Sequence, residues 1–182
     1  MRVLKLAMLA VLAYSMTVGA QAQQKPDNPI SDAIRTVWTG AKRNMLGAAK
    51  AMPEAKYSFK AAETVRTYGQ ILAHVAGANY EFCAAARGEK PPFSEDHFEK
   101  TVTNPAGIAK ALQESMTYCD AAYSALTDVS AVEIVNGPFG GGKQARAAGL
   151  MSNTNHNTEH YGNLVTYLRI NGLVPPSSAP SR

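Results

Sequence analysis

Apolar residues recur at three- and four-residue steps along four long stretches of this chain. The stretches cover about residues 29–52, 64–86, 105–126 and 143–171. In the first stretch the repeating positions are Ile30, Ile34, Val37, Trp38, Ala41, Met45 and Ala48. Such spacing places apolar side chains on one face of a helix. Because no segment alternates convincingly with a period of two, the pattern predicts an all-α fold arranged as a four-helix bundle.

Polar and turn-forming residues separate these stretches where helices are expected to begin and end. Asn28 stands directly before Pro29, which is a typical N-cap followed by a first-turn proline. Gly88 follows the second stretch and is a typical helix stop. Residues 127–142, which end in three consecutive glycines, are predicted to form an irregular loop that leads into the last helix.

The first 22 residues carry the pattern of a secretory signal peptide. Two basic residues, Arg2 and Lys5, precede a mostly apolar run over residues 6–18, and Ala20 and Ala22 form an A-x-A cleavage pattern. The apolar run is shorter than the roughly twenty residues that span a bilayer. We therefore predict export to the periplasm or the outside, with no membrane contact after cleavage.

Cleavage would leave one ordinary domain. We divide the chain into a signal peptide (1–22), a helical domain (23–176) and a polar tail (177–182). The signal peptide holds two of the 18 basic residues and none of the 14 acidic ones. The remaining 16 basic residues exceed the 14 acidic ones by only two, and they form no cluster that would follow a phosphate backbone. We therefore expect no nucleic-acid partner.

The chain has two cysteines, Cys83 and Cys119, and both lie in stretches that are predicted to be helical. In an oxidising compartment they would form one bridge between helices. The alternative is a pair of free thiols in the core, where cysteine is common. Export favours the bridge.

Three of the four histidines stand where they would suit a metal ion. His156 and His160 are four residues apart, which places them about 40° from each other on one helical face. His74 lies in the second predicted helix. Small residues on the same two faces, among them Gly77 and Gly149, would leave room for a ligand. Three protein ligands with one open position are typical of a catalytic zinc site.

Other interpretations of these histidines stay open. One alternative is that they are core residues that satisfy one another through hydrogen bonds and water. The run from His156 to His160 also spells H-x-x-E-H, in which Glu159 would be the general base of a metalloprotease. No Asp or Glu follows Glu159 to supply the third ligand of such a protease, which argues against this class. Glu159 is the one candidate catalytic residue, and the alternative interpretation is a surface carboxylate. Glu81 and Asn153 are further polar neighbours. His97, in a polar loop, is predicted to be a surface residue.

Two sequence segments together resemble the DinB-like superfamily. The run HNTEHYGNLVTYLR (residues 156–169), followed by NGLVPP (171–176), is similar to the last helix of that family. The run VRTYGQILAH (residues 65–74) resembles its second helix, which carries the first metal-binding histidine.

This resemblance implies a four-helix bundle in which His74, His156 and His160 bind a divalent ion, often zinc or nickel, and it implies a homodimer. Characterised members include thiol-dependent transferases and isomerases and metal-dependent hydrolases. The expected function is therefore an exported metal-dependent hydrolase or transferase that acts on a small molecule. The alternative is a non-catalytic bundle of the cell envelope that binds a metal or a small ligand, and an open fourth coordination position would favour the enzyme.

Overall fold

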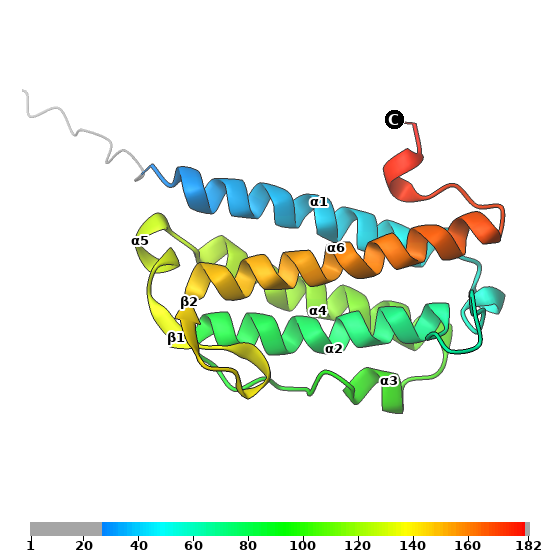
Figure 1. The fold of residues 1–182 in the computed structure, drawn as a ribbon, viewed down its shortest axis with the longest axis horizontal. Coiled ribbons are helices and arrows are strands. Elements are labelled where there is room, and N and C mark those ends of the chain that lie inside the picture. Colours follow the sequence, from blue (N-terminus) through cyan, green and yellow to red (C-terminus); the bar gives the residue numbers. More distant parts are fainter. Residues whose placement is uncertain (1–26, 181–182) are drawn as a thin grey trace, which may run out of the picture.

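Four long helices make up most of the molecule in this computed structural model, which describes residues 27–180 (Figure 1). They are α1 (Pro29–Ala51), α2 (Tyr68–Arg87), α4 (Pro105–Ala125) and α6 (Arg146–Ile170). Helix α2 packs against α4 and α6, and α1 packs against the same two helices from the other side. The predicted all-α four-helix bundle is confirmed. The predicted signal peptide lies outside the described residues.

Short elements connect the long helices. They are η1 (Glu54–Lys56), α3 (His97–Thr101), α5 (Asp128–Ala131), β1 (Ile134–Asn136), η2 (Pro138–Gly140), β2 (Lys143–Ala145) and η3 (Pro176–Ser178). Strands β1 and β2 pair antiparallel, with Val135 opposite Gln144. The prediction of an irregular loop over residues 127–142 is therefore wrong. Three-residue strands are too short for a period of two to stand out in the sequence.

The ends of the helices follow the predicted signals with three exceptions. Helix α6 begins at residue 146 rather than near residue 143, because residues 143–145 form β2. Gly88 ends α2 in the left-handed conformation with φ of +73°, as predicted. Helix α2 begins at Tyr68 rather than near residue 64, because Thr67 and Gln70 form a capping box at its start. Asn28 does not cap α1 with its side chain. Instead the carboxylate of Asp128 accepts hydrogen bonds from the backbone of Ile30 and Ser31 at 3.2 and 2.8 Å.

The apolar stripe of α1 is wider than the surface that its neighbours cover. Trp38 and Met45 are buried, and the ring of Trp38 stacks on Tyr123 with centroids 4.4 Å apart. Ile30 and Val37 are 61% and 60% exposed, so these two members of the predicted apolar face lie outside the core. Within residues 27–180, no helix combines the length and hydropathy that a bilayer crossing requires.

A disulfide bridge joins α2 to α4. Cys83 and Cys119 are bonded, with their Cα atoms 5.3 Å apart, and the favoured interpretation of this pair is confirmed. Both residues are fully buried. The bridge holds α2, which carries His74, against its neighbour in the bundle.

Candidate metal centre

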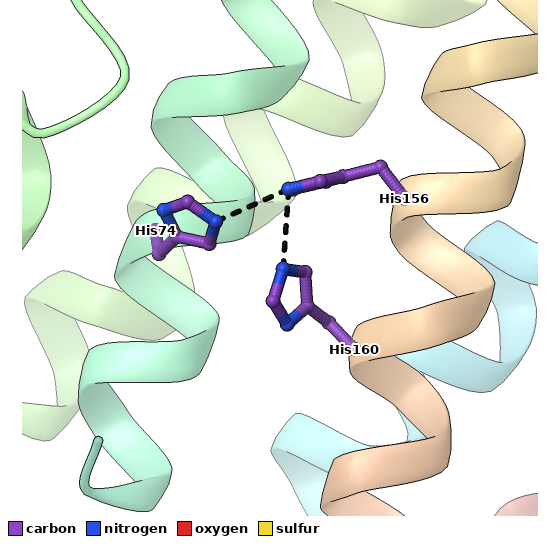
Figure 2. Close-up of side chains that lie close together, drawn as sticks. All are labelled: His74, His156 and His160. Carbon is purple, nitrogen blue, oxygen red and sulfur yellow. Dashed lines mark hydrogen bonds between the residues drawn. The ribbon is translucent and has the colours of Figure 1, made fainter. Parts of the chain in front are cut away.

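Two neighbouring helices bring the three histidines together. His74 lies on α2, while His156 and His160 lie one turn apart on α6, and all three rings point into the space between these helices (Figure 2). Of these three, His74 is the most buried, with 7% of its surface exposed. Their convergence, which the spacing predicted, is confirmed. We refer to these residues as the histidine cluster.

The Nε2 atom of each ring faces the same point. His156 Nε2 lies 3.1 Å from His74 Nε2 and 3.1 Å from His160 Nε2. The ligand atoms of all three residues lie within 4.8 Å of one another. In a tetrahedral zinc site with Zn–N bonds of about 2.0–2.1 Å, neighbouring nitrogens are separated by about 3.3 Å. The cluster therefore has nearly the nitrogen spacing that a shared ion requires.

Burial keeps these imidazoles neutral near pH 7. It lowers the pKa of His74 to about 4 and that of His156 to about 3, and it also lowers the pKa of His160. The neighbouring histidines and Arg66 lower the pKa values of His74 and His156 further. A neutral imidazole offers its lone pair, so the protonation state suits metal binding.

Hydrogen bonds among the rings account for this geometry less well than a shared ion. His156 Nε2 contacts two other ring nitrogens at once, although it can carry either one proton or one lone pair. The other nitrogen of this ring, Nδ1, is buried and has no partner among the described residues. A shared ion would take the lone pairs of all three Nε2 atoms. The donor set therefore fits a divalent metal ion.

A carboxylate faces the outer nitrogen of His74. Glu95 Oε1 lies 3.6 Å from His74 Nδ1. Metal-bound histidines usually donate this second N–H to a carboxylate or carbonyl, which fixes the ring and raises its basicity. At 3.6 Å the two atoms are beyond hydrogen-bond distance, and a shift of a few tenths of an ångström would let Glu95 hold the ring of His74 in this way.

Gly77 is the reason that Glu95 comes so close. A Cβ atom at position 77 would lie 1.9 Å from the backbone oxygen of Glu95, so a larger residue there would displace the segment between α2 and α3. The predicted ligand space beside Gly77 is therefore wrong, because the Glu95 backbone fills it. The space predicted at Gly149 is also occupied, by the side chain of Gln144.

An open depression lies beside His160. Its volume is about 540 Å³, and its lining residues are Thr64, Val65, Arg66, Ile71, His160, Asn163 and Tyr167. Asn163 Nδ2 lies 3.5 Å from His160 Nδ1. If the side-chain amide of Asn163 is turned by 180°, its oxygen would accept a hydrogen bond from an N–H at His160 Nδ1. The depression gives a small molecule a route to the cluster.

Sequence comparison identifies the family of this fold and site. The sequence profile of the DinB superfamily matches residues 38–164. The chain belongs to the DinB superfamily. No curated protein matches the chain in sequence.

Solved structures of similar fold include other DinB-like proteins. One from Bacillus cereus has 20% identity and a TM-score of 0.63, over 80% of this chain and 95% of that chain. One from Bacillus subtilis has 23% identity and a TM-score of 0.58, over 77% and 92%. A mycothiol-dependent maleylpyruvate isomerase has 15% identity and a TM-score of 0.62 over 74% of this chain, which corresponds to 60% of the isomerase. At these identities, the likeness establishes the DinB fold alone.

The other candidate residues of this DinB protein lie away from the cluster's centre. Glu159 is exposed on α6, where its charge raises the pKa of His160. Glu81 is partly buried on α2. Asn153 is fully buried in the core, where its amide donates to Cys83 Sγ at 3.5 Å and to Cys119 Sγ at 3.6 Å, so it does not face an ion. His97 is partly exposed at the start of α3, and its ring packs against Phe93 and Phe98.

Two residues beside the cluster, Glu95 and Arg66, were not predicted from the sequence. Glu95 was visible only as one of several acidic residues in a loop, and Arg66 only as a residue near the start of a helix. In the DinB fold both lie beside the histidine cluster through contacts between distant segments. Gly77 was the available signal for Glu95, because a glycine inside a predicted helix often marks a close backbone approach.

Replacing Glu95 with glutamine is expected to weaken metal binding about tenfold, because a neutral amide supports the His74 N–H less strongly than a carboxylate. The affinity can be measured by competition with a chromophoric zinc chelator. Glu114→Gln is the matched control, because Glu114 is an exposed residue of α4 that pairs with Lys110 on the surface. Equal affinities for wild type and Glu95→Gln would contradict the role of Glu95.

Proposed function

We propose that this protein is an exported metal-dependent hydrolase or transferase whose ion, zinc or nickel, is held by His74, His156 and His160. The observation that carries the proposal is the convergence of three neutral imidazoles next to an open depression. A site with three protein ligands keeps a coordination position for water or substrate. A bound ion would act as a Lewis acid or lower the pKa of a water molecule towards neutrality.

The residues around the site would position the ion and the small molecule that approaches it. The three histidines fix the place of the ion, and Glu95 would orient His74. Asn163 and Tyr167 line the side from which a small molecule would approach. The hydroxyl of Tyr167 donates to the backbone oxygen of Arg66 at 2.7 Å, which holds the segment before α2 at the rim of the depression.

One observation favours the non-catalytic alternative. The residues that line the depression include no aspartate or glutamate, so no carboxylate there is placed to act as a general base. A bundle that binds a metal or a small ligand would need none. An enzyme would convert the molecule that reaches the ion, whereas a binding protein would hold that molecule unchanged.

Cobalt substitution tests the proposal. Protein loaded with Co²⁺ is expected to show a visible spectrum that changes when a small thiol is added, because the thiolate enters the open position. A panel of esters, amides and thiol-transfer substrates is then assayed with the wild type and with His160→Ala. Turnover that the variant lacks would support the enzyme. An unchanged spectrum would indicate a closed site, and a responsive spectrum without any turnover would favour the binding protein.

Export and the homodimer are also proposals. Residues 1–22 carry the signal-peptide pattern, and the Cys83–Cys119 bridge is the kind of bond that persists in oxidising compartments. The mass of protein recovered from a periplasmic extract tests the loss of these residues. Sedimentation of the purified protein tests the homodimer, for which the exposed apolar residues of α1 offer a surface.

A further inference from the structure

We infer that the molecule bound at this site is a small carboxylic acid, whose carboxylate pairs with Arg66 while a second group, such as a thiol or hydroxyl, reaches the ion. The inference rests on the proposed function, because it assigns the substrate class of the same site. It depends on the position of Arg66, on the charges around the depression and on its size.

Arg66 is held at the rim of the depression by contacts on its backbone and on one edge of its side chain. Tyr167 donates to its backbone oxygen, and its Nε donates to both oxygens of Glu99 at 3.1 and 3.2 Å. The side chain is 45% exposed. No hydrogen bond among the described residues uses the two terminal nitrogens of this guanidinium. They form the end of the fork that binds a carboxylate through two parallel hydrogen bonds.

Arg66 lies next to the histidine cluster. Arg66 and His160 both line the depression, so they face the same open space. One small molecule in this space could therefore contact both Arg66 and an ion held by the cluster.

The charges that line the depression favour an anion. Arg66 is the one charged residue in its lining, and no carboxylate joins it there. Three carboxylates lie around the site without lining the depression: Glu99 pairs with the other edge of the guanidinium, Glu95 lies behind His74, and the exposed Glu159 adjoins the cluster in sequence. Inside the depression a ligand would therefore face Arg66 and a divalent ion directly. Only an anionic ligand would gain a charge-assisted pair with Arg66.

The size and walls of the depression limit the ligand to a small molecule. A volume of about 540 Å³ lies within the range of small-molecule sites, and this one is open rather than enclosed. Ile71 and Val65 offer apolar contact, while Thr64 and Asn163 offer hydrogen bonds. A short apolar body with a carboxylate at one end and a metal-binding group at the other matches this surface.

The test uses 3-mercaptopropionate and its neutral amide, 3-mercaptopropionamide, as probes of the Co²⁺-loaded protein. The thiolate of either probe gives a sulfur-to-cobalt absorption band, which reports binding without any need for turnover. Wild type is expected to bind the carboxylate about tenfold more tightly than the amide, because a charge-assisted pair with Arg66 forms only with the carboxylate. In Arg66→Gln the two dissociation constants should become nearly equal.

Two further variants complete the design. Arg66→Lys keeps the charge without the fork and is expected to retain part of the preference. Arg43→Gln removes an exposed cation of α1 and is expected to leave the preference unchanged. A wild-type preference that persists in Arg66→Gln, or the lack of any preference in wild type, would overturn the inference while leaving the metal site intact. Failure of the protein to take up cobalt would overturn the proposed function, and this inference with it.

Discussion

Replacing His156 with alanine is expected to abolish stoichiometric metal binding. His156 Nε2 lies 3.1 Å from the Nε2 atoms of both other histidines, so the variant loses the ligand at the centre of the cluster. Removal of a residue that merely supports a ligand costs about 10–100-fold in metal affinity, and loss of a ligand itself should exceed about 100-fold. The metal content is measured by elemental analysis of protein that was purified without an affinity tag.

The control for this experiment is a histidine outside the cluster. His97→Ala removes the partly exposed imidazole of α3 and is expected to keep the full metal content. Circular dichroism of each variant establishes that the helices are retained. Equal metal in wild type and His156→Ala, or none in either, would eliminate the site.

Loss of the disulfide bridge is expected to have the largest effect on stability. Cys83 and Cys119 are 36 positions apart, and closing a loop of this length lowers the entropy of the unfolded chain enough to stabilise the fold by about 4 kcal/mol. The double variant Cys83→Ser, Cys119→Ser should lose about this much free energy of unfolding, which urea denaturation followed by circular dichroism measures.

A reductant provides the internal control for that experiment. Both cysteines are fully buried, so dithiothreitol should reduce the bridge mainly after the wild type has unfolded. Wild type refolded in dithiothreitol should then match the double variant, whereas untreated wild type should not. A difference below about 1 kcal/mol between the untreated wild type and the double variant would contradict the stabilising role of the bridge.

The histidine cluster was largely predictable because most of its geometry is local. A spacing of four residues places His156 and His160 on one face of any helix, whatever surrounds it. His74 needed one further step, which was that two amphipathic helices of one bundle turn their inner faces towards each other. The three residues therefore follow from periodicity together with the fold class.

The supporting residues depend on tertiary contacts that periodicity does not encode. Glu95 reaches His74 because its backbone packs on Gly77, eighteen positions earlier in the chain. Arg66 is held by Tyr167 and by Glu99, which lie on α6 and α3. Asp128 likewise caps α1 at Ser31, from 97 positions further along the chain. Each contact joins segments whose relative placement is decided only when the bundle has formed.

The missing side chain at position 77 has a consequence for how the metal centre can vary. The segment between α2 and α3 touches the helix where Gly77 leaves it bare, and this contact brings the Glu95 carboxylate up to the outer nitrogen of His74. Substitutions elsewhere in that segment would therefore change how strongly His74 donates electrons to an ion, while all three ligands stay in place. The electronic properties of an ion bound by the cluster would in this way be adjusted from a surface connection, with the helical scaffold unaltered.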